Sequence, residues 1–384
     1  MNFEPDPGVA AFREEVRAFL RQQLPPELAE RARRHHHPLK EDMVAWTRIL
    51  HAKGWSAPHW PAAYGGPGWT PLQRHLFEEE CALAGAPATC ASAFMLVAPV
   101  IMAFGNDEQK ERHLPPILRG ETFWGQGFSE PGAGSDLASL RTRAVADGSD
   151  YIVNGQKTWT TEGHYADWLF CLVRTDAAAK PQRGISFLLI DARSPGITIR
   201  PIISIDGAHS LNEVFFDDVR VPQANRVGDE GQGWTCAKHL LDNERAFSAE
   251  LPRNKRMLAR LQALLAEAPA LQQDAVLMRR VAEAEADLLA LEMLTLRALS
   301  EHGKPEATAW PAGSILHVLG SELQQKTGAL MLQALGERGL VAPDQADEAA
   351  AGITGDYLYR RAVTIYGGSN EIQRNLIARH ALGV

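Results

Sequence analysis

Three short stretches of this chain have the residue types that bind a planar or anionic ligand. Residues 127–136 read GFSEPGAGSD, residues 157–161 read KTWTT, and residues 365–374 read IYGGSNEIQR. Glycines let a backbone approach a ligand closely. A Trp plane can stack on a ring while a nearby hydroxyl binds its edge, and a helix N-terminus presents free N–H groups to an anion. Taken singly, each stretch is explained as well by ordinary structure: a Gly/Pro turn, a Thr-rich surface strand and a capped interhelical turn.

Other residues that could do chemistry favour plainer interpretations. The four cysteines, at positions 81, 90, 171 and 236, are far apart and have no metal-binding spacing, which predicts reduced structural thiols. The triplet at 35–37, three histidines in a basic stretch, is expected to be solvated, and no metal site is expected. No G-x-G-x-x-G follows a predicted strand, so a nicotinamide Rossmann site is not expected.

Composition excludes several classes of partner. The 384 residues carry a formal charge of -8 and are 45% hydrophobic, which is typical of a globular protein of more than one domain. An acidic chain without a basic run is not expected to bind nucleic acid or an anionic membrane. The first residues resemble neither a signal nor a transit peptide, and no apolar run reaches the ~20 residues of a membrane helix. We therefore expect a cytoplasmic protein.

The elements that must position these stretches fall into three parts. Residues 1–121 have helical periodicity, with Val9, Phe12, Val16, Phe19 and Leu20 on one face of a first helix. Residues 122–230 contain strand-like runs at 168–173, 185–190, 197–203 and 214–221, and the Asn154-Gly155 pair predicts a hairpin turn. Residues 231–384 are helical again, over about 233–264, 271–302, 306–335 and 350–365, and predict a four-helix bundle.

The predicted elements also place the second and third stretches. Alternation along a strand would put Trp159 and Thr161 on the same face. A last helix would start near Asn370, where Gln373 three positions later resembles a capping box.

Together, in this order and in an α–β–α chain, the three stretches resemble the acyl-CoA dehydrogenase family over essentially the whole length. Further similar stretches are 53–55 (KGW) and 154–161. The resemblance implies an α+β fold with an N-terminal helical domain, a middle antiparallel β-domain and a C-terminal four-helix bundle. It also implies FAD between the last two domains.

The resemblance assigns cofactor-binding residues position by position. Phe128 and Ser129 would contact the flavin pyrimidine end, with Gly134 in the same loop, and Ser135 would reach the pyrophosphate or the substrate. Trp159 would cover the flavin ring and Thr161 would bond near N5. Ser369 and Glu371 would lie along FAD in the terminal loop.

The catalytic base comes from one of two family patterns. Many members place a Glu directly after the Tyr of the terminal motif, but this chain has Gly367 there. A second pattern places the Glu before an Arg on the first bundle helix, which the sequence LDNER at 241–245 matches, so Glu244 is predicted as base. Gly367 could still donate its N–H to the thioester carbonyl, and Asp242 and Arg245 resemble residues that line the substrate channel. Glu130 is expected to hold its own glycine loop instead.

Two departures from the family concern assembly. In homotetrameric members each subunit lends an Arg-x-x-Phe-Gly segment and a Gln-x-x-Gly-Gly motif to its neighbour's FAD. Here residues 252–256 read PRNKR without a following Phe-Gly, and residues 333–337 read QALGE. A carboxylate near a pyrophosphate would repel it. A heterotetramer with a second related subunit is therefore expected, with a homo-oligomer as the alternative.

The resemblance implies α,β-dehydrogenation of an acyl-CoA, with electrons passed to an electron-transferring flavoprotein. Two other functions stay open: an acyl-CoA oxidase that uses O2, and a non-catalytic structural subunit. The floor of the acyl pocket would come from the N-terminal helices near residues 94–97 and from the first bundle helix. The acyl chain itself is not readable, and dicarboxylyl, medium-chain and steroid side-chain substrates are all compatible with the resemblance.

Overall fold

The computed structural model describes residues 7–34, 37–245, 249–301, 311–342, 345–347, 350 and 352–383. Contacts divide the chain into two compact units, neither of which is continuous in sequence. The sheet unit comprises Leu39–Pro67 and Ala88–Glu244, and the bundle unit comprises Met1–Pro38, Gly68–Pro87 and Arg245–Val384.

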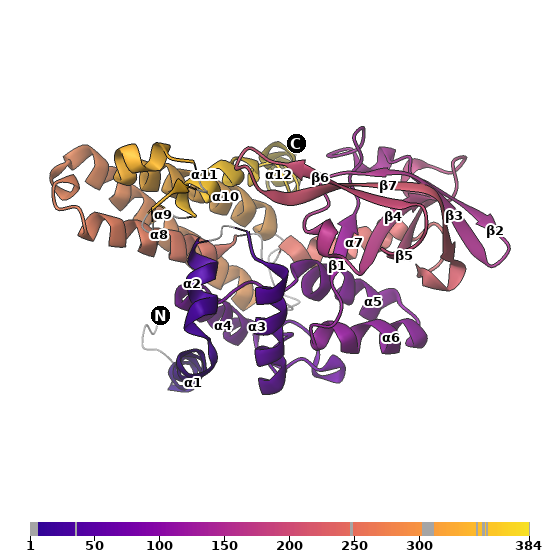
Figure 1. Ribbon diagram of the computed structural model, residues 1–384, viewed down its shortest axis with the longest axis horizontal. Helices are drawn as coiled ribbons and strands as arrows, with labels where there is room; N and C mark the ends of the chain where they lie inside the picture. Colours follow the sequence, from indigo (N-terminus) through magenta and orange to yellow (C-terminus); the bar gives the residue numbers. More distant parts are fainter. Residues whose placement is uncertain are drawn as a thin grey trace. The chain divides into compact units, whose positions relative to one another are not determined.

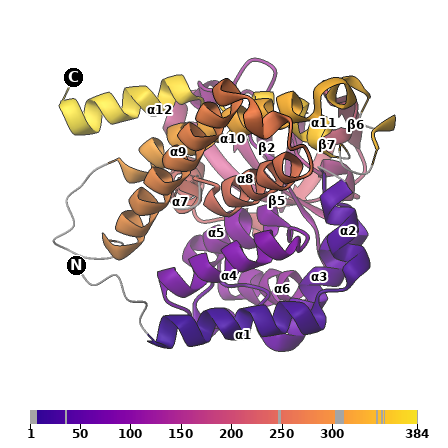
Figure 2. The same cartoon turned by 90° about the vertical axis from the view of Figure 1, so that its left-hand side faces the viewer.

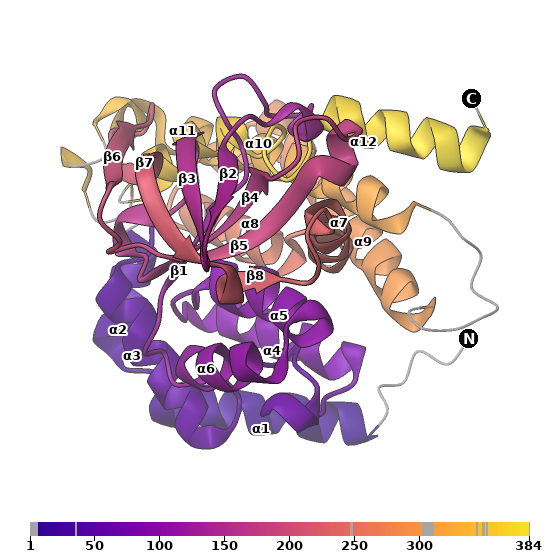
Figure 3. The same cartoon turned by 90° about the vertical axis from the view of Figure 1, so that its right-hand side faces the viewer.

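The sheet unit is built on one eight-stranded sheet with the order β6-β7-β3-β2-β4-β5-β8, and β1 pairs with β4 (Figure 3). Its strands are β1 (Trp124–Gly127), β2 (Arg143–Asp147), β3 (Asp150–Lys157), β4 (Trp168–Arg174), β5 (Ile185–Asp191), β6 (Ile197–Ile203), β7 (His209–Pro222) and β8 (Arg226–Val227). The pairing is antiparallel except for β1 with β4 and the single residue pair between β2 and β4, which are parallel. The four predicted apolar runs are the strands β4 to β7.

The Asn154-Gly155 pair does not form the predicted turn. β3 runs straight through it, and the register against β7 shifts between Val153 and Gly155. The hairpin turn lies earlier, where Asp147 of β2 pairs with Asp150 of β3 and Gly148 has φ 61°. Long-range pairing with β7 therefore overrides the local turn preference, and the pair forms a β-bulge.

Helices α3 (Lys40–Lys53), α5 (Ala98–Phe104), α6 (Asp107–Leu118) and α7 (Gly233–Arg245), together with the π-helix η2 (Ser92–Val97), complete the sheet unit. One face of the sheet shares a core with η2, α5 and α7, in which Phe94, Ile101, Phe170, Phe187 and Leu240 are buried. The opposite face has its own core around Val153, Leu169 and Val214. Because both faces are buried, β4 and β5 are apolar at nearly every position.

The bundle unit contains α1 (Pro7–Gln23), α2 (Pro26–Arg34), α4 (Pro71–Ala84), α8 (Leu251–Ala266), α9 (Ala275–Glu301), α10 (Ala312–Leu335), α11 (Ile353–Tyr359) and α12 (Asn370–Ile377) (Figures 1 and 2). Leucine and methionine side chains from α8, α9 and α10 form its core. On α1 four residues of the predicted face, Phe12, Val16, Phe19 and Leu20, are buried, and Val9 at the start of the helix is partly buried. None of the described helices combines the length and the apolar character needed to cross a bilayer.

Two of the differences between predicted and observed helix boundaries have a local cause. The helix expected over 233–264 is divided into α7 and α8, and Glu250, which precedes α8, has φ 40°. Pro252 occupies the first turn of α8, where its missing N–H costs nothing. The cap of α12 is Ser369 rather than Asn370, because the Ser369 side chain accepts from the Ile372 N–H at 3.4 Å.

Candidate active site

The first two candidate stretches lie side by side in the sheet unit, joined by the buried side chain of Lys157. Its ammonium donates to the Phe128 carbonyl at 3.0 Å and to the Glu130 carboxylate at 2.8 Å. One residue later, the Thr158 N–H donates to the Ser129 carbonyl at 2.9 Å. The end of β3 therefore fixes the loop that follows β1.

Glu130 holds this loop, as the sequence predicted. Its carboxylate also accepts the Arg141 N–H at 2.6 Å and the Thr142 N–H at 2.8 Å, and the residue is buried. Burial alone would raise the pKa of Glu130, but the Lys157 ammonium and these hydrogen bonds outweigh it and lower the pKa. Because the ionised Glu130 carboxylate already accepts hydrogen bonds from Lys157, Arg141 and Thr142, it is not available as a catalytic base.

Beyond Lys157 the chain presents an aromatic plane and a hydroxyl to solvent. Trp159 is 58% exposed, Thr161 is exposed, and Thr158 and Thr160 between and beside them are buried. The predicted alternation is therefore present, but the predicted strand is not, because β3 ends at Lys157 and Trp159 has a left-handed φ of 62°. A large exposed ring held on a strained backbone is the kind of feature that proteins keep for a ligand.

Asn212 supports this segment from β7, and sequence analysis did not identify it. The fully buried amide of Asn212 donates to the Thr160 carbonyl at 3.0 Å, and the Asn212 carbonyl accepts the Thr160 N–H at 3.0 Å. The Glu162 N–H donates to the Ser210 carbonyl at 2.7 Å in the same way. Only the pairing of β7 with β3 brings these residues together, so no local sequence signal could have found them.

The glycines of the 127–136 loop occupy their positions for different physical reasons. A Cβ on Gly127 would lie 2.4 Å from the Cys171 sulfur, so packing requires this glycine. A Cβ on Gly132 or Gly134 would meet nothing within 4 Å, so these two glycines face open space. Gly134 and Ser135 are exposed and available to a ligand.

The ring of Phe128 is directed into the core rather than outward. It is 6% exposed and packs edge-on against Phe170 and Phe187. A flavin contact by this residue would therefore come from its backbone.

The third stretch lies in the bundle unit, between η10 (Arg360–Ala362) and α12. Gly367 and Gly368 have φ of 68° and 93°, a conformation that favours glycine. Ser369 caps α12, and Glu371 is exposed in its first turn. Hydrogen bonding, led by the backbone N–H, lowers the pKa of Glu371 and keeps it ionised.

The predicted base lies on the last turn of α7. The backbone places Asp242, Glu244 and Arg245 on this helix, while their side chains lie outside the described residues. Their roles therefore stay predictions.

Three family models match in order: the acyl-CoA dehydrogenase N-terminal domain over residues 7–121, the middle domain over 125–219 and the C-terminal domain over 231–382. Acyl-CoA dehydrogenase IpdE1 of Mycobacterium tuberculosis (strain ATCC 25618 / H37Rv) is 36% identical over 383 residues, 98% of each chain.

The chain belongs to the acyl-CoA dehydrogenase family.

Solved structures of the family agree with the fold. The Tcur3481-Tcur3483 steroid ACAD superposes with a TM-score of 0.89 at 28% identity, covering 100% of this chain and 99% of that one. The ChsE4-ChsE5 complex from Mycobacterium tuberculosis gives 0.85 at 31% identity, with coverage of 100% and 99%. The predicted α+β fold of an acyl-CoA dehydrogenase, with a helical, a sheet and a second helical domain in that order along the chain, is confirmed.

Members of the family are FAD-dependent oxidoreductases, and the sheet unit of this dehydrogenase fits that cofactor. The exposed Trp159 plane offers a stacking surface for a flavin ring, and Thr161, two residues further on, is exposed as well. The open space at Gly132 and Gly134 lets the backbone approach an anion.

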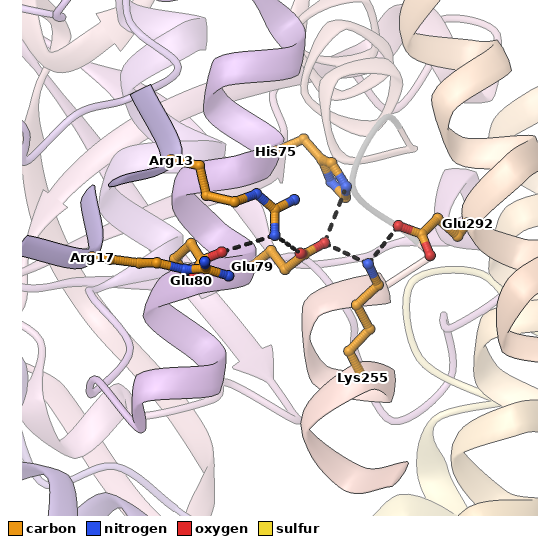
Figure 4. A network of polar contacts seen from close by, with 7 residues as sticks. All are labelled: Arg13, Arg17, His75, Glu79, Glu80, Lys255 and Glu292. Atoms are coloured by element: carbon orange, nitrogen blue, oxygen red, sulfur yellow. Dashed lines mark hydrogen bonds and ion pairs between the residues drawn. The ribbon is translucent and has the colours of Figure 1, made fainter. Parts of the chain in front are cut away.

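The same enzyme has a buried polar network in its bundle unit that includes a metal-like ligand set. His75, Glu79 and Glu292 each offer an atom within 4.8 Å of the others (Figure 4). However, the Lys255 ammonium already donates to Glu79 at 2.6 Å and to Glu292 at 2.5 Å. Lysine therefore supplies the cation that these two carboxylates require. His37, the described member of the 35–37 triplet, packs edge-on against Tyr359 at 4.4 Å.

Proposed function

We propose that this dehydrogenase removes hydrogens from C2 and C3 of a CoA thioester to give the trans-2-enoyl-CoA, with Glu244 as the base. When bound, FAD accepts the hydride equivalent from C3. The observation that carries the proposal is the platform of Trp159 and Thr161, which Lys157 fixes to the 127–136 loop. The family membership supports the reaction type.

The proposed base must remove a weakly acidic proton. A carboxylate in a desolvated pocket has a raised pKa and becomes a stronger base, and it must lie within hydrogen-bond reach of C2. Glu130 is excluded by its buried ion pair with Lys157. The terminal motif offers Gly367 where other members have a Glu. The LDNER sequence on α7 then leaves Glu244 as the residue that matches a family base.

The chain must also stabilise the negative charge that develops on the thioester oxygen. Backbone N–H groups do this in oxyanion holes. Gly367 would supply one such N–H, because a backbone donor needs no side chain. Its left-handed φ of 68° is a conformation that favours glycine. Asp242, Arg245 and Ser135 would contact the CoA thioester, and Ser369 and Glu371 would lie along FAD.

Replacing the proposed base by its isosteric amide tests the reaction. Glu244→Gln should abolish flavin bleaching by an acyl-CoA substrate and leave FAD binding and the unfolding temperature unchanged. Glu322→Gln, at an exposed glutamate on α10 that pairs with Arg374, is a matched control and should bleach normally. Retained turnover in Glu244→Gln would show that the base lies elsewhere. Loss of bleaching on going from the wild type to Glu244→Gln also separates an enzyme from a structural subunit, because a structural subunit has no turnover to lose.

The electron acceptor of the reduced enzyme is proposed to be an electron-transferring flavoprotein. Anaerobic reduction by substrate followed by admission of air tests it against the oxidase alternative. Slow reoxidation by O2, together with fast reoxidation by the flavoprotein, is the expected result. Rapid reoxidation by O2 with release of hydrogen peroxide would identify an oxidase instead.

We also propose that the enzyme works as a heterotetramer with a second, related subunit. The residues that would lend contacts to a neighbour's FAD are engaged within this chain. Arg253 donates to Glu250 at 2.7 Å, and Gln333 accepts from Arg280 at 2.8 Å. Glu337 stands where homotetrameric members have a second glycine. Two solved relatives are named as pairs, Tcur3481-Tcur3483 and ChsE4-ChsE5.

Purification of the chain alone and with its partner tests the assembly. The chain alone should bind FAD poorly, and co-expression with the related subunit should restore one FAD per dehydrogenating site. A stable homotetramer with one FAD per chain would contradict the proposal. The same complex, screened by flavin bleaching with dicarboxylyl, medium-chain and steroid side-chain CoA esters, identifies the acyl class.

A further inference from the structure

A cavity of about 200 Å³ lies in the sheet unit beside α6, where β4 begins and β5 and β7 end. Trp168, Val221 and Pro222 form its apolar wall. An engineered cavity of about 150 Å³ holds benzene, so this one has room for a small organic molecule. None of its lining residues belongs to the three candidate stretches, and the proposed reaction does not use it.

Helix α6 is bonded to the segment that follows β7. The buried amide of Gln109 donates to the Ala224 carbonyl at 2.8 Å and to the Arg226 carbonyl at 2.9 Å. Arg112 follows Gln109 three positions later, so it lies on the same face of the helix. The bonds of Gln109 therefore hold the side of α6 that carries Arg112 beside the chain at Asn225.

Arg112 offers this cavity a guanidinium that has no carboxylate partner among the described residues. It forms neither an ion pair nor a hydrogen bond with them, and its guanidinium carbon lies 4.9 Å from the centre of the Trp168 ring. The Trp168 ring is held in turn by His113 at 4.8 Å and by Trp124 at 5.7 Å, measured between ring centres. A guanidinium stacked on an aromatic face keeps its N–H edge free to donate.

The other charged side chains of the cavity wall already have partners. Asp191 pairs with Arg193 at 3.1 Å. Arg220 pairs with Asp147 at 2.9 Å and with Asp150 at 3.4 Å. Burial alone would raise the pKa of Asp191, but the hydrogen bonds and the charge of Arg193 outweigh it and lower the pKa, so this carboxylate stays ionised. A ligand group with one negative charge therefore suits the cavity better than a dianion, which Asp191 would repel.

Two neutral donors complete the polar part of the wall. Asn225 is 8% exposed, and its side-chain amide forms no hydrogen bond with any described group. The Ser194 hydroxyl likewise has no partner among the described atoms. Both residues line the cavity together with Arg112, so a molecule bound there would meet donors from three separate segments. A carboxylate, whose two oxygens only accept, complements such a set.

We propose that this cavity binds a small carboxylic acid with an apolar body. The carboxylate would accept from Arg112, Asn225 and Ser194, and the apolar body would lie against Trp168 and the end of β7. A neutral amide of the same shape lacks the charge that Arg112 would neutralise, and a phosphate ester carries a second charge. The inference concerns a ligand other than the CoA thioester and does not depend on the proposed dehydrogenation.

Benzoate, benzamide and phenyl phosphate test the proposal, because they share one apolar body and differ in the charge of the polar group. Each is titrated calorimetrically into the full-length enzyme, purified with its FAD and any subunit bound to it, at a pH above 7 where phenyl phosphate is largely a dianion. Benzoate should bind on the order of 10-fold more tightly than either of the others, because a charge-assisted bond is stronger than a neutral one. Equal or tighter binding of benzamide or phenyl phosphate would overturn the proposal.

Variants of the lining residues test whether benzoate binds in this cavity. Arg112→Gln should weaken benzoate binding by on the order of 10-fold and leave benzamide nearly unchanged, and Arg112→Lys, which keeps the charge without the planar fork, should lie between. Ser194→Ala should weaken benzoate roughly 5-fold without touching the stack on Trp168, and it decides the matter if Arg112→Gln is unstable. Arg119→Gln, at an exposed arginine that pairs with Glu121, is the matched control and should bind as wild type. Unchanged benzoate affinity in the lining variants would refute the assignment.

Two further readouts locate the bound acid. The absorption spectrum of the flavin should stay unchanged at saturating benzoate, because an acid bound against the flavin would perturb it. Crystals grown with 4-bromobenzoate should show the anomalous signal of bromine inside the cavity, near Val221. A perturbed flavin spectrum, a bromine elsewhere, or binding at crystal concentration only would each overturn the proposal. Failure of every acyl-CoA to bleach the flavin would instead contradict the proposed dehydrogenation and leave this inference standing.

Discussion

Replacing Lys157 by Met removes the cation that joins the 127–136 loop to the Trp159–Thr161 platform. The ammonium is fully buried and bonds the Phe128 carbonyl at 3.0 Å and Glu130 at 2.8 Å. Removing one partner of a buried ion pair costs about 3–5 kcal/mol. Glu130 keeps two backbone donors, at Arg141 and Thr142, so we expect the lower end, about 3 kcal/mol. For a unit of this size that corresponds to a fall in unfolding temperature on the order of 10 °C.

Thermal unfolding of the complex, followed by both circular dichroism and flavin release, measures the effect. FAD should dissociate before the sheet unit unfolds, because the 127–136 loop loses its link to Trp159. Adding Glu130→Gln to Lys157→Met removes the unpaired charge and should recover part of the stability, which gives a double-mutant coupling energy. Lys180→Met, at an exposed lysine, should change stability by less than about 0.5 kcal/mol. If Lys157→Met unfolds within 1 °C of wild type, the ion pair does not hold the platform together.

Three further changes test other parts of the structure. Trp159→Leu should leave stability nearly unchanged, because the indole is 58% exposed, and should weaken FAD binding by roughly 10-fold through lost stacking; fluorescence titration with FAD measures this, and unchanged affinity would contradict the platform. Lys255→Met should destabilise the bundle unit by about 3 kcal/mol in urea, because Glu292 would lose the cation it shares with Glu79 and Glu79 would keep its pairing with Arg13, and adding Glu292→Gln should recover part of the loss. Burial between Trp124 and Trp168 lowers the pKa of His113 to about 4 from an ordinary value of 6.5, so unfolding takes up a proton and stability should fall as pH drops from 6.5 toward 4. The midpoint of urea unfolding, measured at pH 7.5 and at pH 4.5, should differ less in His113→Phe than in the wild type. If the difference between the two pH values is the same in both proteins, His113 does not cause the fall.

The strands were predictable where hydrophobicity is continuous. β4 and β5 are buried on both faces, so their apolar runs stand out against any alternative. The Asn154-Gly155 turn was wrong because pairing with β7 is stronger than a two-residue preference. The division between α7 and α8 had a local signal in Pro252, but the helical periodicity on both sides concealed it.

The candidate site was predictable as a set of motifs but not as a set of contacts. Trp159 and Thr161 were assigned from the family resemblance, while alternation along the chain predicted only that they share a face; both are exposed as a ligand platform requires. The bond from Lys157 to Glu130 and the support from Asn212 join residues 27 and 52 positions apart, which no local pattern shows.

The link through Lys157 has a consequence for how the enzyme acquires its cofactor. The 127–136 loop and the Trp159 segment are tied by bonds of the polypeptide itself, so neither needs a ligand to take its shape. Little conformational entropy is then lost when the isoalloxazine arrives, and uptake into this half of the site should resemble entry into a rigid, preorganised receptor.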